Sequence, residues 1–170
     1  MDAKIRLSQL YELQKEALIN VHYYAGRVSH FIKWNRRFQI VAALAASATI
    51  ASVVRDVPAD LKWISITGSV IAAVAASIVA VWNFSDSLAK SERMHAAYKM
   101  LYHSTDTLAK QTIGANMLSA EQEAVLSVLE NQLAALGPQD EVDPNLNAMR
   151  KAREIVEQQR PDSYYYPQSA

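Results

Sequence analysis

The sequence contains no cysteine, and its glycines are few and isolated (Gly26, Gly68, Gly114 and Gly137). Without cysteine, the chain has no disulfide bonds, no thiolate metal ligands and no cysteine nucleophile. Isolated glycines cannot form the glycine-rich loops that bind phosphates in dinucleotide-binding proteins and P-loop NTPases. We therefore expect no cofactor.

The chain as a whole also has no net charge, because 17 basic residues balance 17 acidic ones. The balance is not local. Residues 1–37 carry seven basic and three acidic residues (net +4), residues 38–82 carry two of each (net 0), and residues 83–170 carry eight and twelve (net −4). The N-terminal and C-terminal segments are therefore able to pair within or between protomers. We expect no DNA binding.

Two long uncharged runs occupy the middle of the chain: residues 38–54 (17 residues) and residues 63–85 (23 residues). A helix that crosses a bilayer needs about 20 apolar residues, with about 17 as a lower limit. The sequence thus predicts two transmembrane spans joined by an external loop at residues 55–62, with the lipid bilayer as a partner. A soluble hairpin of two alanine-rich core helices is the alternative.

The residues that flank the runs favour the membrane. Interfacial aromatic residues, Trp34, Trp63 and Trp82, lie at the ends of the runs, where such rings meet lipid headgroups. Basic residues are more frequent on the terminal sides than in the loop, which places both termini in the cytoplasm. Residues 1–20 lack the apolar core of a signal peptide. A juxtamembrane basic patch, Lys33, Arg36 and Arg37, is expected to set this topology and bind anionic headgroups.

Helical periodicity continues on both sides of the runs. Within residues 1–37, apolar residues recur at spacings of three and four from Leu10 to Phe31, which predicts one helix from about residue 7 to residue 54. The same pattern appears after the second run, from Leu88 to Leu108. The expected fold class is all-α: a membrane hairpin of two transmembrane helices, extended into a cytoplasmic helical stalk with one or two short C-terminal helices.

Capping signals divide residues 86–137 and the segment beyond them. Ser119 followed by Gln122 predicts a capping box, which starts a helix that Gly137 and the following proline end. We expect this helix to bury Val125, Leu126, Leu129, Leu133 and Leu136. A polar helix at residues 138–160 should open at Asp143–Pro144 and bury Leu146, Met149 and Val156. Residues 161–170, with three consecutive tyrosines, are expected to form a disordered tail.

No group of residues indicates catalysis. Asp140 and its acidic neighbours are expected to be solvated in a loop, so we predict no catalytic residues and no enzyme. His22 and His30, like His95 and His103, are eight residues apart, about 12 Å along a helix, which is too far for one metal ion. In an antiparallel hairpin His30 should lie near His95, and His22 near His103. We expect polar packing there and no metal site.

The second run carries small residues on one side: Ser65, Gly68, Ser69, Ala72, Ala73, Ala76, Ser77 and Ala80. Small residues at this spacing allow helices to approach closely. This face either packs between the spans or between protomers, or it lines an aqueous path once several hairpins assemble into a homo-oligomer.

The order of segments resembles that of the SLATT family of two-span membrane proteins. The resemblance covers roughly residues 5–135 and rests on HYYAGRVSHFIKWNRRF (residues 22–38) before the first run and SERMHAAYKMLY (residues 91–102) after the second. It implies an effector of bacterial antiphage defence that oligomerises and permeabilises the inner membrane when a sensor protein or nucleotide signal, encoded nearby, triggers it. Two alternatives stay open: a non-pore membrane adaptor that recruits a cytoplasmic partner, and a soluble helical interaction module.

Overall fold

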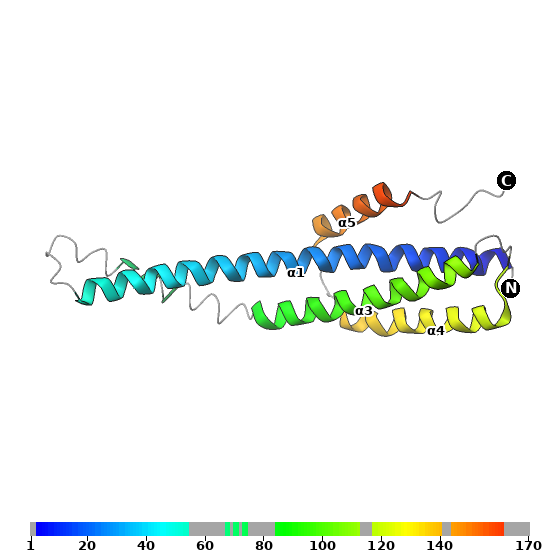
Figure 1. The fold of residues 1–170 in the computed structure, drawn as a ribbon, viewed down its shortest axis with the longest axis horizontal. Helices are drawn as coiled ribbons and strands as arrows, with labels where there is room; N and C mark the ends of the chain where they lie inside the picture. Colours follow the sequence, from blue (N-terminus) through cyan, green and yellow to red (C-terminus); the bar gives the residue numbers. More distant parts are fainter. Residues whose placement is uncertain are drawn as a thin grey trace. The chain divides into compact units, whose positions relative to one another are not determined.

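The computed structural model describes residues 3–54, 67–68, 70–71, 73–74, 84–112, 117–140 and 144–161. In these ranges the chain forms helices α1 (Ala3–Val54), α3 (Phe84–Gln111), α4 (Ala120–Leu136) and α5 (Leu146–Gln159), with a 3₁₀ turn, η2 (Gly137–Gln139), after α4 (Figure 1). The described residues contain no strand. The all-α part of the expected fold class is therefore confirmed.

The chain divides into two compact units. Unit 1 comprises Met1–Arg27 and Lys90–Ala170, and unit 2 comprises Val28–Ala89. Helices α1 and α3 each contribute residues to both units, as the bounds of the helices show.

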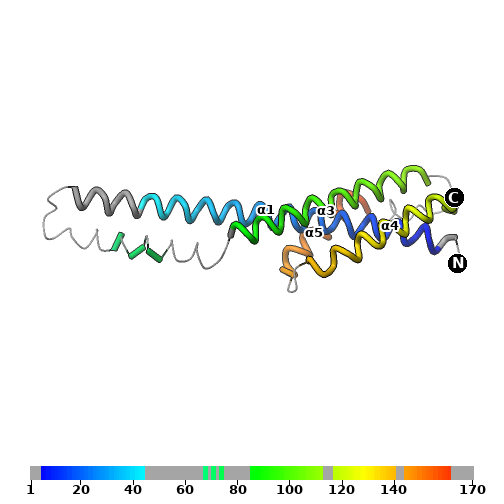
Figure 2. The backbone as a smooth tube through the Cα atoms, turned by 90° about the horizontal axis from the view of Figure 1, so that it is seen from below, coloured from blue at the N-terminus to red at the C-terminus, as the bar shows by residue number. Residues whose placement is uncertain are grey.

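Unit 1 is an antiparallel bundle of helices. The first part of α1 and helix α4 run in one direction, and α3 and α5 run in the other (Figure 1). A second view shows α3 and α4 alongside the first part of α1 (Figure 2). All four helices contribute to the buried core: Leu10, Leu13, Ala17 and Tyr24 from α1, Tyr98 and Leu101 from α3, Leu126 and Leu129 from α4, and Ala152 and Val156 from α5. The expected inward positions of α1 in this unit are thus confirmed.

Helix α4 has the predicted capping box. The Ser119 hydroxyl accepts a hydrogen bond from the Gln122 N–H (3.2 Å), and the Gln122 side chain accepts one from the Ser119 N–H (2.9 Å). Leu126 and Leu129 are buried as expected. Val125 is exposed, and its predicted burial is wrong because it lies about 100° around the helix from Leu126.

Helix α5 begins with Asn145 as its N-cap, two residues later than Asp143–Pro144 predicted. The Asn145 side chain accepts a hydrogen bond from the Ala148 N–H (3.0 Å). Val156 is buried, but Leu146 is 77% exposed, because the part of α5 that packs against the core begins only at Ala148. The predicted tail lies outside the described residues after Pro161.

The expected two-span membrane hairpin is contradicted. Among the described residues, no helix combines the length and the apolar character needed to cross a bilayer. Helix α1 is long enough, but charged residues recur along it from Lys4 to Arg37, and α3 carries charges from Asp86 to Lys110. The shorter helices α4 and α5 are charged as well.

The expected inner-membrane location depended on those spans and is corrected with them. The predicted external loop at residues 55–62 lies outside the described residues. So does most of the second predicted span, of which only residues 67–68, 70–71, 73–74 and 84–85 are described.

Candidate functional site

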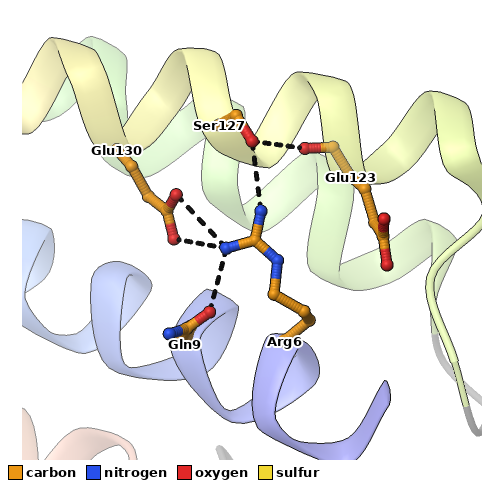
Figure 3. A network of polar contacts seen from close by, with 5 residues as sticks. All are labelled: Arg6, Gln9, Glu123, Ser127 and Glu130. Carbon is orange, nitrogen blue, oxygen red and sulfur yellow. Dashed lines mark hydrogen bonds and ion pairs between the residues drawn. The ribbon is translucent and has the colours of Figure 1, made fainter. Parts of the chain in front are cut away.

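Arg6 joins α1 to α4 in unit 1 (Figure 3). One guanidinium nitrogen donates to Glu130 (3.2 Å) and to Gln9 (3.0 Å), and the other donates to the Ser127 hydroxyl (3.1 Å). Ser127 in turn donates to the backbone carbonyl of Glu123 (3.0 Å). A basic residue of the N-terminal segment thus pairs with an acidic residue of the C-terminal segment within the chain, as the charge distribution allowed.

Asp140 connects the turn after α4 to the two longest helices of unit 1. Its carboxylate accepts hydrogen bonds from the Tyr24 hydroxyl and from the Tyr98 hydroxyl, the latter at 3.0 Å. The two tyrosine rings stack with centroids 5.8 Å apart. Burial raises the pKa of Tyr98, and the charge of Asp140, its hydrogen bond and the charge of Glu16 raise it further. Tyr98 is therefore a neutral donor to Asp140 at neutral pH. Asp140, expected to be solvated, is only partly exposed, and its carboxylate is bound by two tyrosines.

Asp106 on α3 is the centre of a second polar cluster. It accepts hydrogen bonds from the Gln14 side chain (2.8 Å) and from Arg160 (3.3 Å), and it forms an ion pair with Lys110 (2.6 Å). The Arg160 guanidinium also lies over the ring of Tyr102, 5.4 Å from its centroid. Burial alone would raise the pKa of Asp106, but the hydrogen bonds and charges of Lys110 and Arg160 outweigh it and lower the pKa. This cluster links α1, α3 and the C-terminal end of α5.

A cavity of about 570 Å³ lies between α1, α4, η2 and α5 in unit 1, with Tyr98 of α3 in its wall. Its charged lining consists of the acidic residues Glu12, Glu16 and Asp140 and the basic residues Lys15 and Arg153, a net charge of −1 (two basic minus three acidic).

Apart from Tyr98, the remaining wall of the cavity is apolar except for one amide. Ile19, Leu133 and Met149 form the apolar part, and Asn20 supplies the amide. A volume of this size is typical of sites for small molecules. The sequence did not predict this cavity, because it depends on how four elements far apart in the chain come together.

Burial lowers the pKa of His95, and the charges of Lys99 and His22 lower it further. The predicted pairings of His22 with His103 and of His30 with His95 stay predictions. Within the described ranges, no three His, Cys, Asp or Glu side chains are arranged to hold a metal ion.

In unit 2, the predicted basic patch and Trp34 lie on α1. Lys33, Arg36 and Arg37 are exposed, and the Arg37 guanidinium lies 5.4 Å from the centroid of the Trp34 ring. The Trp34 ring stacks on Phe38, with centroids 5.7 Å apart. Trp63 and Trp82 lie outside the described residues.

Of the predicted small-residue face, the structure describes only Gly68 and Ala73, and Ala73 is exposed. The other predicted members of this face lie outside the described residues. The choice between a packing face and a pore face thus stays a prediction.

Unit 2 also exposes large apolar side chains. On α1, Ile40, Val41 and Leu44 are exposed, Leu44 by 66%. Val70, Ile71 and Val74 are exposed as well. These six residues form two groups, one on α1 and one within residues 70–74, and we refer to them together as the unit 2 apolar surface. The sequence indicated their apolar character, but it did not indicate that the folded chain leaves them uncovered.

Comparison with known proteins identifies no relative. No family model matches the chain, and no curated protein or solved structure is detectably similar to it.

Proposed function

We propose that this chain is a non-catalytic helical adaptor that self-associates through the unit 2 apolar surface and offers unit 1 to a partner. The observation that carries the proposal is the contrast between the units. Unit 1 contains the buried core, to which all four helices contribute, although it also exposes large apolar residues such as Met100, Val128 and Leu146. Among the described residues of unit 2, no side chain is buried. Unit 2 leaves Ile40, Val41, Leu44 and their counterparts at Val70, Ile71 and Val74 exposed. Apolar surfaces of this kind mark interaction sites.

A second copy of the chain fits this surface because it brings an identical apolar face to a symmetric contact. Completing the burial of a half-exposed Ile, Leu or Val contributes about 1 kcal/mol. Six such residues from each of two protomers then contribute on the order of 10 kcal/mol. This is comparable with the cost of association, about 4–15 kcal/mol. The gain therefore offsets a cost in the middle of this range, and we expect self-association that depends on the protein concentration.

The basic patch beside this surface predicts how the stability of the oligomer depends on the salt concentration. Lys33, Arg36 and Arg37 are exposed on the helix that carries Ile40 and Leu44. Association brings two such patches near each other, and salt screens their repulsion. We therefore expect the oligomer to become more stable as the salt concentration rises.

The effector role, its activation by a sensor or nucleotide signal and the likeness to the SLATT family stay predictions from the sequence. Membrane permeabilisation is not part of the proposal, because it required the two spans. The adaptor role needs only a surface for self-association and a folded unit for a partner.

Size-exclusion chromatography coupled to light scattering, which measures the molar mass of the eluting protein, tests the proposal. The full-length wild type is compared with the double variant Ile40→Glu/Leu44→Glu and with the control Leu146→Glu, which changes a similarly exposed leucine in unit 1. The wild type and the control should elute as oligomers, and the double variant as a monomer with unchanged helix content by circular dichroism. A monomeric wild type, or a double variant that keeps the wild-type mass, contradicts the proposal.

A further inference from the structure

Asn20 is a buried polar residue in the wall of the unit 1 cavity. It is only 7% exposed as a residue, and it belongs to the cavity lining. Its amide is not a desolvated group without a partner, because among the described residues only Gln14 Oε1 is buried without a hydrogen-bond partner. An amide carries two N–H donors and a carbonyl acceptor, so Asn20 supplies polar groups to a ligand in the cavity.

The buried polar residues of the cavity lining favour a cation. Besides Asn20, its buried polar lining is Tyr98, which is 2% exposed, and the Tyr98 hydroxyl donates its proton to the Asp140 carboxylate. The Tyr98 oxygen, the Asn20 carbonyl oxygen and the charge of Asp140 thus present acceptors and negative charge to a ligand. The raised pKa of Tyr98, to which both Asp140 and Glu16 contribute, agrees with a negative potential at this point.

The lining also contains three apolar residues and two exposed acidic residues of α1. Ile19, Leu133 and Met149 line the cavity, and Glu16 and Glu12 precede Asn20 on α1 by one and two turns. One helical turn separates Glu16 from Asn20 by about 6 Å along the axis. This spacing is comparable with the separation of the two nitrogens in a short linear diamine.

We propose that the cavity binds a linear aliphatic diamine of four or five carbons. One ammonium group donates to Asn20 and lies in the field of Asp140, the carbon chain lies against Ile19, Leu133 and Met149, and the second ammonium group lies beside Glu16.

The two basic residues of the lining provide the sharpest test. Arg153 on α5 is exposed and brings a positive charge to the cavity, and so does Lys15. If the ligand is a cation, removing the charge of Arg153 strengthens binding. If the site instead accepts an anion, the same substitution weakens it.

Isothermal titration calorimetry on the full-length chain at low ionic strength tests the proposal with three probes. Cadaverine is the diamine, pentylamine lacks the second ammonium group, and glutarate is a five-carbon dicarboxylate of opposite charge. We expect cadaverine to bind more tightly than pentylamine, and glutarate not to bind.

Four variants complete the test. Glu16→Gln and Asn20→Leu should each weaken cadaverine binding roughly tenfold, the change expected for one hydrogen bond or ion pair to a charged group. Arg153→Gln should strengthen it several-fold. Glu92→Gln, at an exposed position on α3 outside the cavity lining, is the matched control and should leave it unchanged.

Three results overturn the proposal: no heat of binding with cadaverine at millimolar concentration, glutarate binding as tightly as cadaverine, or weaker cadaverine binding in Arg153→Gln. Glu16 and Arg153 are exposed, so their variants retain the fold. They keep the test decisive even if Asn20→Leu alters the packing of the buried wall.

Discussion

Replacing Asp140 by alanine removes the acceptor that Tyr24 and Tyr98 share. Both tyrosines are buried, and each donates its hydroxyl to one oxygen of this carboxylate. Since Asp140 follows the 3₁₀ turn η2 after α4 and the tyrosines lie on α1 and α3, the substitution removes two hydrogen bonds that join this turn to both helices.

The loss of stability follows from these two hydrogen bonds. A hydrogen bond to a charged group contributes about 1.5–3 kcal/mol, so two contribute about 3–6 kcal/mol if both partners are fully buried. Asp140 is only partly buried, and water replaces part of what is lost. We therefore expect Asp140→Ala to lower the free energy of unfolding by about 2–4 kcal/mol. For a chain of this size, the midpoint of thermal unfolding then falls by roughly 5–15 °C.

Urea unfolding of four proteins measures this effect: the wild type, Asp140→Ala, Tyr98→Phe and the double variant. The double-mutant cycle should give a coupling energy of about 1–2 kcal/mol between Tyr98 and Asp140. Asp140→Asn, which keeps an acceptor oxygen but loses the charge, should lie between the wild type and Asp140→Ala. Additive losses from Tyr98→Phe and Asp140→Ala would refute the reasoning, because the two side chains would then not interact.

Three further predictions concern the core, a helix cap and a buried charge. Leu126→Ala should lower the free energy of unfolding by about 2–5 kcal/mol, whereas Val125→Ala, one position away but exposed, should cost less than about 1 kcal/mol; urea unfolding separates them. Ser119→Ala should cost about 1 kcal/mol by the same assay, because it removes one half of the capping box. The lowered pKa of Asp106 stabilises the fold above the ordinary carboxyl pKa, and this stabilisation is lost as the pH falls through the lower folded value, below about pH 4. Asp106→Asn should remove that part of the pH dependence, as measured by the thermal midpoint between pH 2 and pH 6.

Features that depend on a few neighbouring residues were predictable from the sequence. The capping box needs only Ser119 and Gln122, three residues apart, and its geometry is as expected. The spacing of Leu10, Leu13 and Ala17 likewise predicted the buried side of α1. In both cases the periodicity of the helix itself determines which side chains meet.

Features that depend on how helices pair were not predictable in the same way. Tyr24 stacks on Tyr98, and Gln14 donates to Asp106, and these contacts set the pairing of α1 with α3. Periodicity gives the face of each helix but not its axial position against a neighbour. The same limit explains why the cavity was not predicted, since the residues of its wall are far apart in the sequence.

The prediction for Leu146 failed for a related reason. Its spacing from Met149 placed it on the apolar side of α5, but contact with the core begins only at Ala148. A pattern along one helix cannot show where the neighbouring helices end. The two transmembrane spans were likewise predicted from the composition of single segments, and the described helices do not support them.

The central claim, self-association through the unit 2 apolar surface, is tested most directly by a single spin label. The chain has no cysteine, so one introduced cysteine reports only on distances between protomers. Gln39→Cys places a label at an exposed position next to Ile40, and Met100→Cys places one on an exposed residue of α3 in unit 1 as the control. Double electron–electron resonance should show a defined dipolar distance between protomers for the label at residue 39. The absence of any such signal at residue 39, at every protein concentration measured, would contradict the account.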